Sequence, residues 1–265
     1  TNISMTLNIE QFKKNLTVIV LCGGKGQRLR PLTSDIPKPL IKIRNKALLE
    51  YIINHLLKFN IKNIIVASGY KNHLIKKFIS NKYKNKVEVI YTGIKTDILT
   101  RIKKITEKKE GDFLVCYGDT LVDININKLA KFYLLNKNKI VLSSYELKSS
   151  FGIININKKN NAVLKFEEKP NLGVWFNIGY ILFSQKYCRM LSRFKKFEFF
   201  LNFCANKKLM MSFKHPGKHI TVNTITELEN AKSQIKKFIW KKKINFYKKK
   251  NVLITGAAGF VGSNL

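Results

Sequence analysis

Hydrophobic and polar positions follow one another along the first half of the chain in a pattern that predicts alternating strands and helices. Residues 17–21 (TVIVL) form a short, continuously apolar run, which is typical of a strand buried on both faces of a parallel sheet. Residues 48–59 then carry apolar side chains at helical spacing. Further strands are predicted at 63–67, 87–91 and 113–117, and further helices at 71–80 and 98–107. This alternation predicts a doubly wound α/β domain with a mainly parallel sheet.

The second half of the chain has a different pattern. Short segments of alternating polarity predict strands that extend the sheet in antiparallel fashion, at 140–146, 152–156, 162–167 and 176–183. Helices are predicted to follow at 187–193, 197–206 and 226–239. Residues 1–16 are a polar leader in which no element is predicted.

Net charge changes the picture of possible partners. The chain of 265 residues has 50 Lys and Arg against 16 Asp and Glu, a formal charge of +34. Such a charge is typical of proteins that bind a phosphate backbone. The excess is mostly Lys and comes with abundant Asn and Ile, so we interpret it as compositional drift and expect no specific nucleic-acid partner.

Cysteine usage and hydropathy bear on the compartment. Four cysteines, Cys22, Cys116, Cys188 and Cys204, form no C-x-x-C pair, which favours reduced thiols and a cytoplasmic location. No apolar run approaches the roughly 18 to 20 residues that span a bilayer, so no membrane association is expected.

The densest chemical signal is the segment 21–40, LCGGKGQRLRPLTSDIPKPL. Gly23, Gly24 and Gly26 directly follow a buried strand, so their backbone N–H groups can surround phosphate oxygens. Arg28 adds a planar cation suited to phosphate, and Lys38 lies between two prolines that restrict the backbone around it. We predict a phosphate-binding loop that is not a Walker A loop, because the G-K-[ST] ending is missing.

This segment resembles the G-G-x-G-T-R-L and P-K-P signature of the sugar-1-phosphate nucleotidyltransferases, also called nucleotide-sugar pyrophosphorylases. The resemblance extends over residues 17–235 and implies a Rossmann-like enzyme that joins a sugar 1-phosphate to a nucleoside triphosphate, with release of pyrophosphate. It implies that Leu21 and the glycines bind the nucleotide, and that Arg28 and Lys38 are catalytic.

Two downstream motifs keep the register of this family. Asp119 in YGDTLVDI matches the catalytic Mg²⁺ ligand, and Asn223 of VNT stands where the family has its second metal-binding Asp. The resemblance therefore implies Mg²⁺ as cofactor, with Asp119 also catalytic. In KFEEKP, it implies that Glu168 and Lys169 hold the sugar and its phosphate.

Within the family, the sequence is most similar to the glucose-1-phosphate cytidylyltransferases. The segment TGIKTDILTRIKKI implies nucleotide contacts, whereas WFNIGY implies sugar-phosphate contacts. The implied contact residues are Thr92, Gly93, Thr96 and Arg101 for the nucleotide, and Asn177 and Gly179 for the sugar phosphate. This favours CTP, with GTP or UTP as alternatives.

Departures from the family pattern leave a second interpretation open. Gln27 replaces the usual Thr, Asp97 to Thr100 replace Met-Thr-Gly-Gly, and Asn223 replaces a carboxylate. A degenerate homologue that binds nucleotide or polyanion without turnover is therefore the alternative. His215 and His219 are not expected to bind metal, and a homo-oligomer is possible.

The end of the sequence predicts a second unit. Residues 1–235 are predicted as the transferase domain and the basic stretch 236–250 as a linker, which includes Trp240 as a packing anchor. Residues 251–265 (NVLITGAAGFVGSNL) carry a glycine motif that resembles the start of an NAD-dependent sugar epimerase or dehydratase. We expect such a domain to be fused downstream, although this segment alone cannot bind NAD.

Overall fold

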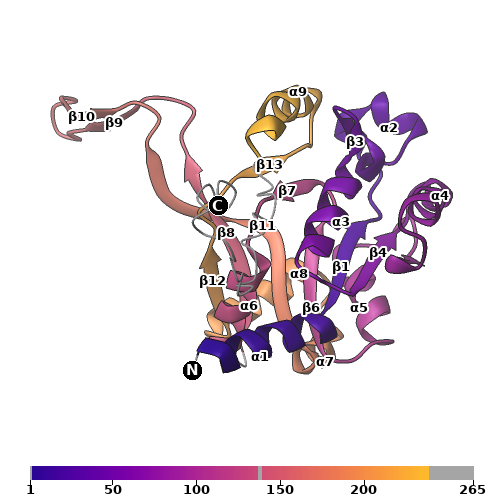
Figure 1. Cartoon of the computed structure of the whole chain (residues 1–265). Helices are drawn as coiled ribbons and strands as arrows, with labels where there is room; N and C mark the ends of the chain where they lie inside the picture. Colours follow the sequence, from indigo (N-terminus) through magenta and orange to yellow (C-terminus); the bar gives the residue numbers. More distant parts are fainter. Residues whose placement is uncertain (1, 137–138, 239–265) are drawn as a thin grey trace, which may run out of the picture.

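The centre of the molecule is a seven-stranded sheet (Figure 1). A computed structural model describes residues 2–136 and 139–238. In chain order the sheet consists of β1 (Thr17–Cys22), β4 (Asn63–Ser68), β5 (Glu88–Tyr91), β6 (Asp112–Tyr117), β8 (Ile140–Lys148), β11 (Asn171–Ser184) and β12 (Met210–Lys214). In space the order is β12-β8-β11-β6-β1-β4-β5. β11 runs antiparallel to β6 and β8, whereas the other strands run parallel to one another, which confirms the predicted doubly wound, mainly parallel α/β fold.

Helices cover both faces of this sheet, as crossovers between parallel strands require. One face carries α3 (Leu48–Lys58), α4 (Asn72–Tyr83) and α6 (Ile126–Leu135), and the other carries α5 (Ile98–Thr106), α7 (Gln185–Leu191) and α8 (Phe197–Asn206). The helical stripe seen in the sequence is buried as predicted, with Ile52 and Ile53 of α3 in the first core and Ile102 of α5 in the second. These two cores fix the strand ends that form the candidate site.

The amino-terminal segment forms a helix that the sequence analysis missed. α1 (Asn2–Asn15) packs near α6, and its Lys13 side chain is almost fully buried. The Lys13 ammonium donates to Glu10 Oε1 and to Asn127 Oδ1, each at 2.7 Å. A buried ammonium is tolerated when its donors are paired. Ile9 and Phe12 of α1 and Leu16 directly after it also contact the first core, so the segment has a short apolar stripe that the sequence analysis did not use.

The last predicted helix is wrong at its carboxyl end, and several short elements were not predicted. α9 (Ile225–Gln234) ends before residue 239 and continues into a 3-10 turn, Ile235–Lys237. The sequence analysis also missed β12, the five-residue edge strand of the sheet. The other unpredicted short elements are α2 (Leu32–Asp35), β2 (Lys42–Ile43), β3 (Lys46–Ala47), β7 (Thr120–Val122), β13 (His219–Thr221) and the 3-10 turns Gln27–Leu29, Lys38–Leu40 and Lys84–Lys86. Elements of two to four residues are too short to carry a periodic pattern.

Two predicted strands do not join the sheet. β9 (Ile153–Ile156) and β10 (Val163–Glu167) pair with each other as a separate antiparallel ribbon, so the prediction that they extend the sheet is wrong. The ribbon projects from the body beyond the ends of β8 and β11 (Figure 1). β11 changes register against β8 twice, between Asn171 and Trp175 and between Asn177 and Ile181, where the strand leaves the regular ladder. Residues 149–175 are called the arm below.

Two sequence predictions fall outside the described residues. These are the basic linker from residue 239 on, with Trp240, and the glycine motif within residues 251–265. Within 2–136 and 139–238, no helix has both the length and the apolar character that a membrane crossing needs.

Candidate active site

A cavity of about 530 Å³ opens at the carboxyl ends of β1 and β6. In open α/β sheets, ligands bind at this edge. Many of the residues that the sequence singled out line this cavity together. They are Leu21, Gly23, Gly24, Gly26, Arg28, Lys38, Thr96, Arg101, Asp119 and Asn223.

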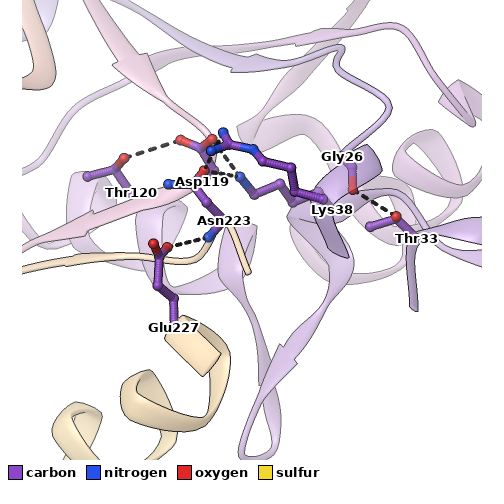
Figure 2. A network of polar contacts seen from close by, with 8 residues as sticks. Gly26, Thr33, Lys38, Asp119, Thr120, Asn223 and Glu227 are labelled. Atoms are coloured by element: carbon purple, nitrogen blue, oxygen red, sulfur yellow. Dashed lines mark hydrogen bonds and ion pairs between the residues drawn. The ribbon is translucent and has the colours of Figure 1, made fainter. Parts of the chain in front are cut away.

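The glycine loop that follows β1 forms one wall. Gly26 has a left-handed backbone with φ of 63°, which explains the need for glycine there. Its carbonyl accepts a hydrogen bond from Thr33 Oγ1 at 2.9 Å (Figure 2). At Gly24, a side-chain carbon would meet no atom within 4 Å. The backbone at Gly24 is therefore open to a ligand, whereas Gly26 shapes the turn.

Glycine is required at position 23 for a different structural reason. A Cβ at Gly23 would collide with the guanidinium of Arg101, which is only 4% exposed. Arg101 donates to Gly23 O at 3.1 Å, to Ser68 O at 3.3 Å and to Thr92 Oγ1 at 2.5 Å. Arg101 thus ties the glycine loop to the ends of two neighbouring strands. It also borders the cavity, so its positive charge is available to an anion there.

Thr92 and Gly93, which the sequence assigned to the nucleotide, do not line the cavity. The Thr92 hydroxyl donates to Ser68 O at 2.7 Å and accepts from Arg101, so it serves the packing of the loop. Gly93 has a φ of 109°, and a Cβ there would collide with Thr96 Oγ1. Thr96 lines the cavity and donates its hydroxyl to Thr92 O at 2.8 Å.

Lys38, Asp119 and Asn223 form a polar cluster at the base of the cavity (Figure 2). Lys38 Nζ lies 2.7 Å from Asp119 Oδ2 and 2.8 Å from Asn223 Oδ1. Arg28 adds a longer contact of 3.4 Å from its Nη2 to the same Asn223 oxygen. The Lys38 ammonium therefore joins three segments that lie far apart in the sequence. Only 12% of the Lys38 side chain is exposed.

The end of β6 holds Asp119 in place. Gly118 N donates to Leu21 O at 3.1 Å, and a Cβ at Gly118 would collide with that carbonyl. Thr120 Oγ1 donates to Asp119 Oδ1 at 3.2 Å (Figure 2). The close approach of β1 and β6 thus sets the carboxylate beside the glycine loop.

The start of α9 holds Asn223, with a contribution from Glu227 that the sequence analysis missed. Thr224 Oγ1 caps the helix by accepting from Glu227 N at 3.2 Å, and Glu227 Oε2 accepts from Asn223 N at 2.6 Å (Figure 2). The T-x-x-E pattern at 224–227 is a capping-box signal in the sequence. It could have been used to predict this helix start.

The same cluster contains oxygen atoms of the kind that Mg²⁺ takes as ligands. Asp119 and Asn223 already direct one carboxylate and one amide oxygen at a shared cation, the Lys38 ammonium. Mg²⁺ prefers oxygen ligands and takes much of its shell from phosphates and water. Within the described ranges, no group of three or more His, Cys, Asp or Glu side chains could hold a metal without such help.

Asp123, the second carboxylate of the YGDTLVDI loop, has a structural partner. His215 Nε2 lies 3.0 Å from Asp123 Oδ1, and Lys218 N donates to the same oxygen at 2.6 Å. Burial would raise the pKa of Asp123, but the hydrogen bonds from His215 and Lys218 outweigh it and lower the pKa. Burial lowers the pKa of the nearby His219 to about 4, so this imidazole is neutral at pH 7. Asp123 therefore fastens the 214–218 loop.

Asn177 and Gly179 do not line the cavity themselves, but both adjoin Tyr117, which does. Asn177 Nδ2 lies 3.4 Å from Tyr117 Oη, and Gly179 N donates to Asn177 Oδ1 at 2.8 Å. Gly179 has a φ of 76°, and a Cβ there would collide with the Tyr117 ring. Sequence analysis did not single out Tyr117, which ends β6 two residues before Asp119.

Glu168 and Lys169 are not brought to this cavity. Both follow β10 in the arm, with 62% and 58% of their side chains exposed, and neither lines the cavity. Lys169 Nζ lies 3.7 Å from Glu168 Oε1. Nothing in a KFEEKP motif tells whether its strand belongs to the sheet or to a projecting ribbon.

The segment that departs from the family pattern begins α5. Asp97 caps this helix by accepting from Thr100 N and Thr100 Oγ1, each at 3.0 Å. Burial raises the pKa of Asp97, but these capping hydrogen bonds lower it more. Asp97 and Ile98 line the cavity, while Leu99 is buried in the core. The two cavity-lining residues therefore stand at the Met and Thr positions of the pattern that the sequence was compared with, whereas Leu99 and Thr100, at its two glycine positions, do not line the cavity.

Cys22, at the end of β1, also lines the cavity. Burial raises the pKa of its thiol, and the nearby Asp119 carboxylate raises it further. The thiol is protonated at neutral pH and is therefore a poor nucleophile. The groups of this cavity that can act on an anionic ligand are therefore its charged side chains, Arg28, Lys38 and Arg101 among them.

Comparison with protein families decides the assignment. The nucleotidyl transferase family matches residues 17–203 of the chain. The chain belongs to this family of enzymes. All of the strands and loops that form the cavity up to Asp119 lie within the matched part of the transferase.

Individual relatives are guanylyl- and cytidylyltransferases. The transferase is 34% identical over 158 residues to D-glycero-alpha-D-manno-heptose 1-phosphate guanylyltransferase of Campylobacter jejuni, covering 58% of this chain and 69% of that protein. It is 25% identical over 240 residues to glucose-1-phosphate cytidylyltransferase of Salmonella typhimurium, covering 80% of this chain and 93% of the relative. The crystal structure of HddC from Yersinia pseudotuberculosis shares the fold, with a TM-score of 0.63, 23% identity, and coverage of 83% of this chain and 99% of that one.

Proposed function

We propose that this enzyme transfers the nucleotidyl group of a nucleoside triphosphate to a sugar 1-phosphate and releases pyrophosphate. The observation that carries the proposal is the cluster of Lys38 with Asp119 and Asn223 beside the glycine loop. It supplies positive charge and oxygen ligands at one point in a cavity at the ligand-binding edge of the sheet. The names of the guanylyl- and cytidylyltransferase relatives support sugar 1-phosphates as the acceptor class.

The proposed reaction is an in-line displacement. A phosphate oxygen of the sugar 1-phosphate forms a bond to the α-phosphorus, and the bond from that phosphorus to the oxygen bridging to the β-phosphate breaks. Pyrophosphate leaves with the electron pair of that bond. No covalent intermediate on the protein is required, so catalysis consists of positioning and charge stabilisation.

The cavity residues have distinct roles in this scheme. Gly23, Gly24 and Gly26 surround the triphosphate with backbone N–H groups. Arg28 offsets charge on the leaving pyrophosphate, and Lys38 stabilises charge as it redistributes over the α-phosphoryl group. Lys38 must then exchange part of its contact with Asp119 for a phosphate oxygen.

Asp119 and Asn223 would hold Mg²⁺ in this proposal. When bound, the ion neutralises phosphate charge and orients the reacting oxygens. Asn223 contributes an amide oxygen and no negative charge, so the protein's own share of the binding is weak and the phosphates supply much of it. Asn177 and Gly179 shape the side of the cavity next to Tyr117, where the sugar phosphate would enter.

CTP is the proposed nucleotide, with GTP as the competing candidate. The matches at Thr92, Gly93, Thr96 and Arg101 to the cytidylyltransferase pattern favour CTP. The similarity to a heptose 1-phosphate guanylyltransferase favours GTP. UTP is the remaining alternative left open by the sequence.

Pyrophosphate release tests the function. The full chain is incubated with Mg²⁺ and each of CTP, GTP, UTP, ATP and dTTP, paired in turn with glucose 1-phosphate, mannose 1-phosphate and a heptose 1-phosphate. We expect turnover with one nucleotide well above the others. Absence of turnover with every pair would contradict an active transferase.

A second candidate is a homologue that binds polyanions without turnover. The net charge of +34 and the neutral Asn223 favour it. Salt-sensitive RNA binding together with no pyrophosphate release would identify this case.

We further propose how this activity is organised along the chain. Residues 1–235 would act as the transferase unit, residues 236–250 would link it, and an NAD-dependent epimerase or dehydratase unit would begin at 251. The four free cysteines are compatible with a reducing, cytoplasmic setting.

A further inference from the structure

The arm has one apolar face and one polar face. The register of β9 against β10 places Ile154 opposite Phe166 and Ile156 opposite Val163. Residues that pair across an antiparallel ribbon share a face, so these four side chains form one apolar surface. The other face, called the polar face, carries the pairs of Asn155 with Lys165 and of Ile153 with Glu167. The Lys165 ammonium lies 2.9 Å from Glu167 Oε1.

This apolar face is exposed, as are the flanks of the arm. Phe166 is 63% exposed and Val163 is 59% exposed, and further large apolar side chains are exposed on the arm. These further residues are Phe151, Ile153, Leu164, Leu172, Val174 and Trp175. A two-stranded ribbon is marginally stable in water by itself. Contiguous exposed apolar surface of this kind marks an interaction site.

The arm lies away from the cavity of its own chain, and this position bears on which molecule covers its apolar face. Glu168 and Lys169, the residues implied for the sugar phosphate, follow β10 directly, yet no arm residue lines the cavity of the same chain. Asn177 is the nearest predicted sugar-side residue that lies beside the cavity, and it belongs to β11, which begins at Asn171. At about 3.3 Å per residue, the start of β11 lies up to roughly 20 Å along the strand from Asn177, and Lys169 comes before that start.

The mouth of the cavity offers a matching apolar surface. Ile94 and Ile98 line the cavity and are nevertheless 46% and 39% exposed. These two side chains form an exposed apolar rim at the cavity. One chain thus carries both an apolar ribbon that reaches away from its body (Figure 1) and an apolar rim at its cavity.

We propose that the arm docks on a second copy of this chain and places Glu168 and Lys169 at the mouth of that copy's cavity. The apolar face of the arm packs on the rim of the partner's cavity. The Lys169 ammonium then meets the phosphate of a sugar 1-phosphate bound there, and Glu168 meets sugar hydroxyls. The assignment of this ligand rests on the proposed function, whereas the docking itself rests on the arm and the rim.

Complementation between two impaired variants tests the shared site, with activity measured at a sugar 1-phosphate concentration well below its KM. Lys38→Ala removes the cavity lysine and leaves the arm intact, and Lys169→Ala does the reverse. The two variants are co-expressed with different tags, and the mixed oligomers are purified over both tags. A cavity with Lys38 then meets an arm with Lys169, and random pairing restores about a quarter of the wild-type sites before enrichment. If each arm serves its own chain, every chain carries one lesion and the mixture is no more active than the average of the two variants measured alone, which overturns the proposal.

The mass in solution tests the docking independently of turnover. We expect the wild-type chain to sediment as an oligomer at micromolar concentration, and Ile154→Ser with Phe166→Ser to sediment as a monomer. Asn155→Ser with Lys165→Ser is the matched control, because it changes the same strands on the polar face and should remain oligomeric. Circular dichroism and the melting temperature check that the body is folded in all variants.

The outcomes separate this inference from the proposed function. An oligomer that depends on the apolar face but releases no pyrophosphate with any substrate pair contradicts the function and leaves the docking supported. A wild-type monomer with full turnover contradicts the docking and leaves the function supported. An oligomer that is unchanged by Ile154→Ser with Phe166→Ser also overturns the docking.

Discussion

The cavity edge and the arm carry the two halves of one predicted substrate site, but they are built in opposite ways. At the cavity edge, Lys38 is held by Asp119 and Asn223 and only 12% of its side chain is exposed. In the arm, 58% of the Lys169 side chain is exposed, and its ion pair to the adjacent Glu168 is 3.7 Å long. The cavity lysine is preorganised by contacts within its own chain. Among the described residues, the arm lysine has no comparable set of contacts.

This difference shows that the position of a motif's side chains depends on the element that carries the motif. The glycine loop and Asp119 lie directly at the ends of buried parallel strands, so the sheet fixes their positions. Glu168 and Lys169 follow a ribbon with its own two-stranded pairing. The cavity edge should therefore respond to changes in packing, and the arm should respond to changes in assembly.

The largest expected effect follows from removing the preorganised cation. Lys38→Ala should lower kcat by about 100- to 1000-fold, because a positioned donor to the transition-state charge is lost. Steady-state pyrophosphate release measures the loss. Lys42→Ala, an exposed lysine four residues later, is the control and should retain activity. Equal losses in both variants would contradict a specific role for Lys38.

A pair of glycine substitutions distinguishes packing from ligand contact inside the loop. Gly23→Ala should destabilise the fold by about 1 to 3 kcal/mol, because its Cβ collides with the buried Arg101 guanidinium. Gly24→Ala meets no neighbour and should melt like the wild type. Thermal unfolding measures both. A loss of activity in Gly24→Ala without loss of stability would support phosphate binding at that backbone.

The arm lysine should have a smaller and different effect. Lys169→Ala should raise the KM for the sugar 1-phosphate by about tenfold, because one charge-assisted contact to phosphate is lost. Its thermal unfolding should be unchanged, since the side chain is exposed. Lys165→Ala on the polar face of the same ribbon is the matched control and should leave KM unchanged. An unchanged KM in Lys169→Ala would remove this residue from the site.

Acid should act on the body and spare the arm, which contains no histidine. Burial lowers the pKa of His55 to about 4, and its Nε2 lies 2.8 Å from Ile124 O. The unfolded state therefore takes up a proton before the folded state does, so stability is full above about pH 6.5 and falls towards pH 4. The loss is at most about 1.4 kcal/mol per pH unit for this group. Urea unfolding between pH 7 and 4.5 should show a shallower fall for His55→Gln, whereas His73→Gln, at an exposed position, should behave like the wild type.

The smallest effect concerns the neutral metal ligand. Asn223→Asp should lower the Mg²⁺ concentration needed for half-maximal activity by several-fold, because a carboxylate adds charge attraction for the ion. A Mg²⁺ titration of turnover measures it. An unchanged Mg²⁺ dependence would count against placing residue 223 at the metal.

The fold could be predicted from the sequence because continuous apolar strands alternate with amphipathic helices. Thr17–Cys22 and Leu48–Lys58 were predicted to within a residue for this reason. α1 was missed because its apolar stripe is short and is interrupted by polar residues and the exposed Leu7. The buried contact of Lys13 with Asn127 adds no periodic signal. The ribbon was assigned to the sheet because an alternating strand looks the same whether it pairs inside a sheet or outside it.

The candidate site could be predicted where a sequence motif lies at or near the end of a strand of the central sheet. Lys38 and Asp119 are 81 residues apart in the chain and meet because β1 and β6 are neighbours, as the doubly wound order requires. Glu227 was missed because its role runs through the backbone of Asn223. Glu168 and Lys169 were expected at the cavity but lie in the arm, because the KFEEKP motif carries no signal for where its strand pairs.

Strand β11 belongs to the sheet at one end and to the arm at the other, and this has a thermodynamic consequence. In the proposed assembly, a substrate that contacts two copies at once binds the oligomer more tightly than the separated chain. Mass action then requires the substrate to favour assembly by the same factor. Sugar 1-phosphate should therefore lower the protein concentration at which oligomers form. The amount of chain present becomes a control on the activity of each chain.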